Sequence, residues 1–186
     1  MEKWGKVEGR TLVFVGDGNN VCASLIHATA LSGMSFVAVT PTTHQPYEQA
    51  AEDFAALSSS SLGSYRHTNS LDGLEGADAV YTDTWVSMGQ EEDAEDRLRA
   101  LQDYQITPEL MASTGKKAYF MHCLPAHRNQ EVTDTVIDSV ESLVYEQAEN
   151  RLHVQKTLLL TLLAPGDVTR YMQLEKYADW SRSTDS

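Results

Sequence analysis

TLVFVGDGNNV, residues 11–21, joins a run of β-prone residues to a glycine-containing turn and to the start of a helical pattern. Thr11–Val15 has the composition of a buried strand. Val21, Leu25 and Ala28 then follow at the i, i+4, i+7 spacing of one helix face. A strand, a turn and a helix in this order are typical of a parallel sheet whose strands are connected by helices.

The same alternation continues along the rest of the chain. Further strands are expected at Ser35–Val39, Tyr65–Asn69, Ala77–Asp83, Ala118–Met121 and Leu143–Tyr145. Helices are expected at Asn20–Gly33, Pro46–Leu57, Glu91–Asp103 and Glu146–Ala164. The fold class predicted from this pattern is α/β, a parallel sheet with helices on both faces in a single domain.

Composition excludes several classes of protein. The chain has 186 residues, of which 41% are hydrophobic and 22% charged, so it is globular rather than disordered. Its formal net charge of −13 disfavours binding to nucleic acid and to anionic membranes. The two cysteines, Cys22 and Cys123, are too few for a disulfide scaffold, which favours a reducing compartment. Because Met1–Gly9 has no apolar leader and the longest apolar run is Leu158–Ala164, we expect a soluble, cytoplasmic protein.

Four polar loops follow predicted strands. In a parallel sheet with right-handed crossovers, the carboxyl ends of all strands meet at one edge, where ligands bind. The loops are Gly16–Asn20, Asp83–Gly89, His122–Pro125 and Glu146–Arg151. Their expected convergence at this edge is the main functional indication in the sequence.

The first loop allows two interpretations. Gly16 and Gly18 match the first two glycines of a dinucleotide fingerprint, but Val21 stands where the third glycine would be. Val39–Pro41, at the end of the second strand, also lacks the acid that binds a ribose. Both departures disfavour a nicotinamide cofactor. The alternative is a turn followed by a helix cap, with Asn20 as the capping residue.

The second loop places a carboxylate at a strand end. Asp83 could hold an amine there, with Ser87 and the Met88 backbone as further hydrogen-bonding groups. The alternative is that Asp83 caps a turn, while Trp85 and Met88 pack in the core.

The third loop contains His122, Cys123 and His127. Cys123 could be a nucleophile, a proton-transfer group or a small buried hydrophobe. Zinc binding by these three residues is disfavoured, since neighbouring residues of a strand point to opposite faces and the chain has no Cys-x-x-Cys.

The fourth loop carries a cation close to the expected start of a helix. Arg151 is unfavourable at the positive end of a helix dipole unless it binds an anion or a carbonyl oxygen. Ion pairing with Glu146, Glu149 or Asp83 is the alternative.

In this order, GDGNN, DTWVSMG, HCLP and EQAENR resemble the C-terminal half of the ornithine carbamoyltransferases, over roughly residues 2–163. The resemblance implies a Rossmann-like ornithine-binding domain at residues 1–164. Residues 165–186 run past the family's usual end, and their apolar spacing predicts a helical extension.

The resemblance also implies roles for particular residues. The positions that would contact substrate are Asn20, Asp83, Ser87, Met88, Cys123, Leu124 and Arg151. Of these, Asp83 would fix the α-ammonium group of ornithine, while Arg151 and the region of Cys123 would stabilise the developing oxyanion. The Asp-x-x-x-Ser-Met pattern favours ornithine over aspartate, putrescine or acetylated ornithine. The reaction that the resemblance implies requires no metal and no organic cofactor.

The donor side of the reaction has no counterpart in this sequence. The family binds carbamoyl phosphate through a Ser-Thr-Arg-Thr-Arg segment of its N-terminal domain, and nothing here matches that segment. The resemblance therefore implies that carbamoyl phosphate binds through a missing N-terminal domain, and that the partner of this chain is a complementing chain or further copies in a homo-oligomer. The alternative is a non-catalytic module that binds an amino acid or another protein.

Overall fold

The structure, a computed structural model, describes residues 3–58, 62–86, 89, 91–168 and 170. Two units form in it, Met1–Tyr145 and Glu146–Ser186. Each unit is described by itself.

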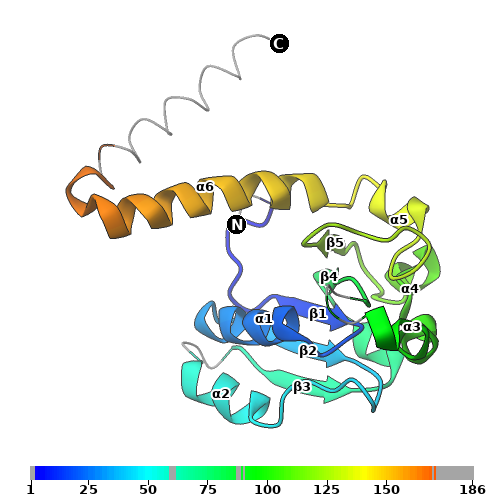
Figure 1. Cartoon of the computed structure of the whole chain (residues 1–186). Helices are drawn as coiled ribbons and strands as arrows, with labels where there is room; N and C mark the ends of the chain where they lie inside the picture. Colours follow the sequence, from blue (N-terminus) through cyan, green and yellow to red (C-terminus); the bar gives the residue numbers. More distant parts are fainter. Residues whose placement is uncertain (1–2, 59–61, 87–88, 90, 169, 171–186) are drawn as a thin grey trace. The chain divides into compact units, whose positions relative to one another are not determined.

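The first unit is built on a five-stranded parallel sheet. Its strands are β1 (Thr11–Val15), β2 (Ser35–Val39), β3 (Tyr65–Thr68), β4 (Ala79–Thr82) and β5 (Tyr119–His122). They lie side by side in the order β3-β2-β1-β4-β5 (Figure 1). Leu12 in the central strand pairs with Phe36 of β2 on one side and with Ala79 of β4 on the other. The predicted α/β fold with a parallel sheet is confirmed.

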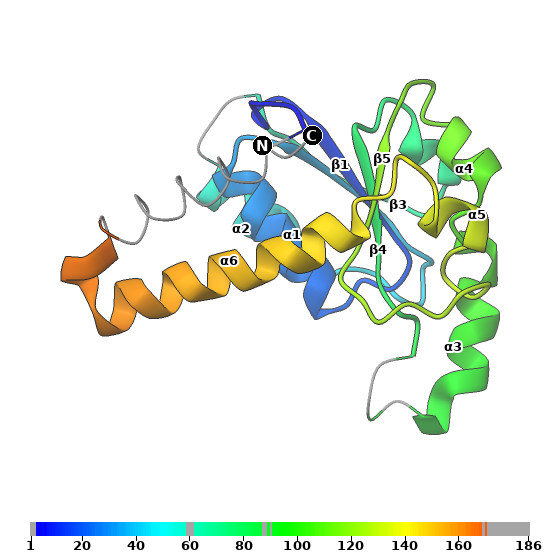
Figure 2. The same ribbon diagram turned by 90° about the horizontal axis from the view of Figure 1, so that it is seen from above.

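Helices cover both faces of this sheet (Figure 2). On one face lie α1 (Asn20–Leu31) and α2 (Ala50–Leu57). On the other lie α3 (Ala94–Leu101), α4 (Pro108–Ala112) and α5 (Asp134–Ile137). Short 3₁₀ segments are η1 (Leu71–Leu74), η2 (Glu91–Asp93) and η3 (Gln102–Tyr104). The acidic helix expected at Glu91–Asp103 is thus η2, α3 and η3 in succession.

Successive side chains of each strand point to opposite faces of the sheet, which produces two hydrophobic cores. Leu12 and Phe14 pack with Cys22 and Ile26 of α1, while Val13 and its same-face neighbours pack with η1 and α5. Because both faces are covered, the inner strands β1 and β2 are almost continuously apolar, as is usual for parallel sheets. Burial on both faces is why TLVFV shows no polar alternation.

The strand expected at Leu143–Tyr145 is not formed, and this prediction was wrong. Ser142 makes only an isolated bridge to Phe120, and the Leu143 N–H donates to the Phe120 carbonyl at 2.9 Å. Helix α6 (Val144–Leu163) begins at the next residue, because Val144 is buried in the core and a helix-forming sequence follows it. Glu146–Arg151 is therefore the first part of a helix, not a loop after a strand.

The second unit contains most of α6 and the short η4 (Pro165–Asp167). Six leucine and valine side chains of α6 are more than half exposed: Leu152, Val154, Leu158, Leu159, Leu162 and Leu163. Residues 169 and 171–186 lie outside the described part of the chain, so the helical extension stays a prediction. None of the helices that the structure describes is both long enough and apolar enough to cross a membrane.

Candidate active site

The candidate site lies where the strand order of the sheet reverses. From β1 the chain proceeds through β2 to β3 on one side, whereas β4 and β5 lie on the other. The loops after β1 and β4 therefore diverge at the carboxyl edge, which is the usual binding position in such sheets. The Thr82 hydroxyl donates to the Val15 carbonyl at 2.7 Å and joins the two strand ends beneath these loops.

Asn19 connects the two loops. Its side-chain oxygen accepts the Val21 and Cys22 N–H groups at 3.0 and 3.1 Å and so caps α1. Its Nδ2 donates to Asp83 Oδ2 at 2.8 Å. The prediction that Asn20 is the capping residue was wrong, since Asn20 is the first residue of the helix and is exposed. Sequence reasoning missed Asn19, although two adjacent asparagines before a helix signal that either can cap it.

Gly18 is needed for contact with another part of the same chain. Its N–H donates to the His44 carbonyl at 2.9 Å. A Cβ at this position would lie 2.4 Å from the Gln45 carbonyl carbon and from the Pro46 nitrogen. Backbone thus fills the space beside Gly18 that a pyrophosphate would need, a second argument against the dinucleotide interpretation.

Replacing Gly18 with alanine is expected to lower the free energy of unfolding by about 1–3 kcal/mol, since backbone must move to admit the methyl group. Urea denaturation followed by circular dichroism measures this loss. Gly166→Ala is the control, because open space surrounds that position and the change should stay within about 0.5 kcal/mol. Equal stability of the Gly18 variant and the wild type would contradict the packing role.

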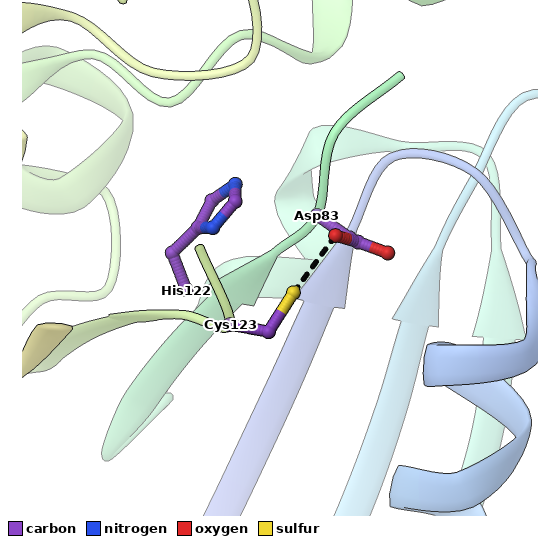
Figure 3. Close-up of side chains that lie close together, drawn as sticks. All are labelled: Asp83, His122 and Cys123. Carbon is purple, nitrogen blue, oxygen red and sulfur yellow. Dashed lines mark hydrogen bonds between the residues drawn. The ribbon is translucent and has the colours of Figure 1, made fainter. Parts of the chain in front are cut away.

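Asp83 and Cys123 meet at the centre of the site (Figure 3). The Cys123 thiol donates to Asp83 Oδ1 at 2.9 Å, and the Thr84 N–H donates to the same oxygen at 2.8 Å. Asp83 is 8% exposed, and Asn19 holds its other oxygen. The two candidate loops after β4 and β5 are therefore brought together as the sequence predicted.

The cysteine of this pair is a neutral thiol. Burial, reinforced by the hydrogen bond to Asp83, raises the pKa of Cys123 to about 12. A thiolate nucleophile requires a lowered pKa, so this arrangement does not favour covalent catalysis by Cys123. Of the roles open to Cys123, hydrogen bonding or proton transfer fits the geometry best.

The side chains of Asp83, His122 and Cys123 also have metal-ligating atoms within 4.8 Å of one another. Protein groups already engage these atoms: His122 Nδ1 accepts the Leu124 N–H at 2.8 Å, and the thiol and carboxylate share a hydrogen bond. His127, the third residue of the disfavoured zinc set, contacts Thr84 Oγ1 through Nδ1 at 2.9 Å. The arrangement is a hydrogen-bonded network, and the expected independence from metal stays a prediction.

Comparison with known proteins places this geometry in a family. The model of the aspartate/ornithine carbamoyltransferase Asp/Orn-binding domain matches residues 8–162. The chain belongs to this family. As a carbamoyltransferase domain, it carries the Asp83–Cys123 pair at the edge of the sheet that positions ligands in such folds.

Individual relatives agree with this assignment. An ornithine carbamoyltransferase of Methanospirillum hungatei is 45% identical over 163 residues, 88% of this chain and 53% of that protein. A putrescine carbamoyltransferase of Mycoplasma mycoides is 48% identical over 162 residues, 86% of this chain and 44% of that protein. The structure of ornithine carbamoyltransferase from Pyrococcus furiosus superposes with a TM-score of 0.79 at 43% identity, over 86% of this chain and 51% of that one. The carbamoyltransferase domain thus spans about half the length of these relatives.

The other predicted site residues lie in different places. Leu124 follows Cys123 with a φ of +56° and is partly buried. Ser87 and Met88 fall outside the described residues. Arg151 lies on α6 in the second unit, where it is exposed. The contribution of every predicted site residue to the carbamoyltransferase site is a proposal.

Arg97 is a structural residue that sequence reasoning missed. It extends from α3 and forms an ion pair with Asp17 of the first loop. Its Nε also donates to the Trp85 carbonyl in the second loop at 3.1 Å. One guanidinium group therefore connects the two loops that hold Asn19 and Asp83. The acidic surroundings of Arg97 in the sequence gave no sign that it is paired at long range.

Proposed function

We propose that this domain binds ornithine and is the acceptor half of an ornithine carbamoyltransferase, which converts carbamoyl phosphate and ornithine to citrulline and phosphate. The observation that carries the proposal is the buried Asp83 carboxylate, held by Asn19 and Cys123 at the reversal point of the sheet. The names of the M. hungatei and P. furiosus relatives support it.

In this proposal Asp83 binds the α-ammonium group of ornithine by a charge-assisted hydrogen bond. Cys123 remains a thiol that contacts Asp83 and faces the reacting amine. That amine loses a proton and attacks the carbamoyl carbon, after which the bond to phosphate breaks and phosphate leaves with the electron pair. Leu124 lines the reacting centre, and Arg151 stabilises the oxygen of the carbamoyl group as its charge grows.

Asn20, Ser87 and Met88 complete the proposed ornithine contacts. In this proposal carbamoyl phosphate is bound by a separate domain, which a complementing polypeptide provides. The alternative, a non-catalytic amino-acid-binding module, differs in one measurable way: it binds ornithine but yields no citrulline when a carbamoyl phosphate domain is added.

Putrescine is a second candidate acceptor, because a putrescine carbamoyltransferase is 48% identical to this chain. Putrescine lacks the α-carboxylate of ornithine but keeps both of its amines. A contact between Asp83 and an ammonium group is therefore open to both acceptors, and a preference for ornithine rests on groups that bind its carboxylate, a role open to Ser87 and the Met88 backbone in this proposal. Calorimetric titration with each ligand separates the two, and tighter binding of putrescine would overturn the ornithine assignment.

Asp83→Asn is expected to weaken ornithine binding by about 1.5–3 kcal/mol, the usual contribution of a hydrogen bond to a charged group. Cys123→Ser should weaken it less, because its proposed contact is with the reacting amine. Isothermal titration measures both variants against wild type. Asp96→Asn is the matched control, since that carboxylate is exposed on α3. Equal affinity of wild type and Asp83→Asn would remove Asp83 from the site.

A further inference from the structure

Behind the site lies a fully buried pair of ionisable residues that the proposed reaction does not use. His122, the last residue of β5, and Glu131 are both 0% exposed. Their Nε2 and Oε1 atoms are 3.3 Å apart. Burying such groups is costly unless neighbouring groups compensate them, so their surroundings indicate what they do.

The two residues hold opposite ends of the loop that contains Cys123. His122 Nδ1 accepts the Leu124 N–H at 2.8 Å, and Glu131 Oε1 accepts the His127 N–H at 2.5 Å. Leu124 has a positive φ of 56°, which a branched side chain rarely adopts without a specific restraint. The bond to His122 provides that restraint, directly after Cys123.

The same contacts define which nitrogen carries the proton of the neutral ring. A nitrogen that accepts an amide N–H carries no proton, so the proton of a neutral His122 lies on Nε2. Nε2 faces the Glu131 carboxylate, and this contact favours the same tautomer. With its accepting nitrogen engaged by Leu124, the ring has no free lone pair for the proton of Cys123. Figure 3 shows the thiol directed at Asp83 instead, with the His122 ring off the line between them.

The loop is also joined to Asp83 at its far end. The His127 ring contacts Thr84 Oγ1 at 2.9 Å, and the Thr84 N–H donates to Asp83 Oδ1. The backbone of Glu131 is fixed in turn, because its carbonyl accepts the Ile106 N–H at 2.9 Å. The buried pair is thus anchored on one side and holds the Asp83–Cys123 contact on the other.

We propose that His122 and Glu131 are positioning residues, which fix the backbone on both sides of Leu124 so that the Cys123 thiol meets Asp83. Neither accepts the proton of Cys123. The value of this contact for catalysis rests on the proposed ornithine function, whereas the positioning itself is measurable without ornithine.

Reactivity of the Cys123 thiol is a direct readout of this positioning. The rate of alkylation by iodoacetamide is measured from pH 7 to 10 in a Cys22→Ala background, so that one cysteine reacts. The groups facing the Cys123 thiol are Asp83 and Tyr81. When the loop releases Sγ from Asp83, both causes of the raised pKa weaken, burial first and the hydrogen bond to Asp83 second, and the pKa of the thiol falls from about 12 toward its ordinary value near 9. The thiolate fraction then rises by more than its nucleophilicity falls, so alkylation at pH 8.5 should accelerate at least about tenfold.

Two variants of His122 separate positioning from general loosening. His122→Asn keeps an oxygen near the place of Nδ1 for the Leu124 N–H, whereas His122→Gln keeps a donor toward Glu131 and loses that acceptor. We expect the tenfold acceleration for the glutamine variant and a rate within about threefold of wild type for the asparagine variant. A glutamine variant that reacts like wild type, or equal acceleration in both variants, would overturn the proposal.

A measurement on the unmodified chain covers the case in which the variants fail to fold. Nitrogen-15 NMR of the neutral ring should show His122 with an unprotonated Nδ1 and a protonated Nε2. The opposite tautomer would overturn the positioning role. Ornithine titration is independent of these results, so a failure of the proposed function leaves the alkylation and NMR outcomes readable.

Discussion

The 186-residue chain alone is expected to form no citrulline above background from carbamoyl phosphate and ornithine. It provides the proposed acceptor site around Asp83 and Cys123, but its sequence has no match to the family's phosphate-binding segment. Holding two reactants together supplies about 7–11 kcal/mol of a reaction barrier. Its loss lowers the rate by at least about five orders of magnitude, which places turnover below detection.

A colorimetric citrulline assay tests this expectation, with and without a separately produced carbamoyl phosphate domain from a relative such as the M. hungatei enzyme. Citrulline that forms only in the mixture, and that Asp83→Asn reduces, supports the acceptor-half proposal. Turnover by the chain alone at an enzyme-like rate would refute the expectation. A silent mixture in which the chain still binds ornithine would favour the non-catalytic alternative.

Local pattern was enough to predict the sheet and two of the loops at its edge. TLVFV and SFVAV are buried on both faces, so their apolar character was unambiguous. Asp83 and Cys123 follow adjacent parallel strands, and their proximity is a consequence of topology. The hydrogen bond between them depends on side-chain orientation, which a spacing pattern does not contain.

The failures have equally specific causes. Leu143–Tyr145 is too short to separate a buried strand from the first turn of a buried helix, because Val144 is apolar in either case. The helix cap was predicted at Asn20, one residue after its true position at Asn19, which is a normal uncertainty at helix ends. His122 and Glu131 were overlooked as a pair. They are nine positions apart, and both are buried because the chain returns at Glu131 to pair with the segment between η3 and α4, which the sequence pattern does not show.

Arg97→Ala is expected to lower the free energy of unfolding by about 3 kcal/mol, the lower part of the range for breaking a buried ion pair. Arg97 and Asp17 side chains are 17% and 12% exposed, so little water replaces the lost guanidinium group. The Trp85 carbonyl loses its donor in the same variant. Urea denaturation, followed by circular dichroism, measures the change.

Arg99→Ala on the same helix is the matched control. Arg99 pairs with Asp96 at 3.1 Å, but these side chains are 72% and 81% exposed, and such pairs contribute about 0–1 kcal/mol. The control removes the same atoms from the same helix, so the difference in unfolding free energy between the two variants isolates the buried contacts of Arg97. Similar losses for both would contradict the role assigned to Arg97.

The Arg97→Ala variant also tests which contacts hold the site together. Arg97 joins the loop of Asn19 to the loop of Asp83, whereas His122 and Glu131 contact the loop that contains Cys123. Arg97→Ala should therefore weaken ornithine binding while leaving the His122 tautomer unchanged. If Arg97→Ala both weakened ornithine binding and changed the His122 tautomer, the contacts of Arg97 and those of His122 and Glu131 would form one cooperative unit, in which the acceptor site unfolds as a whole.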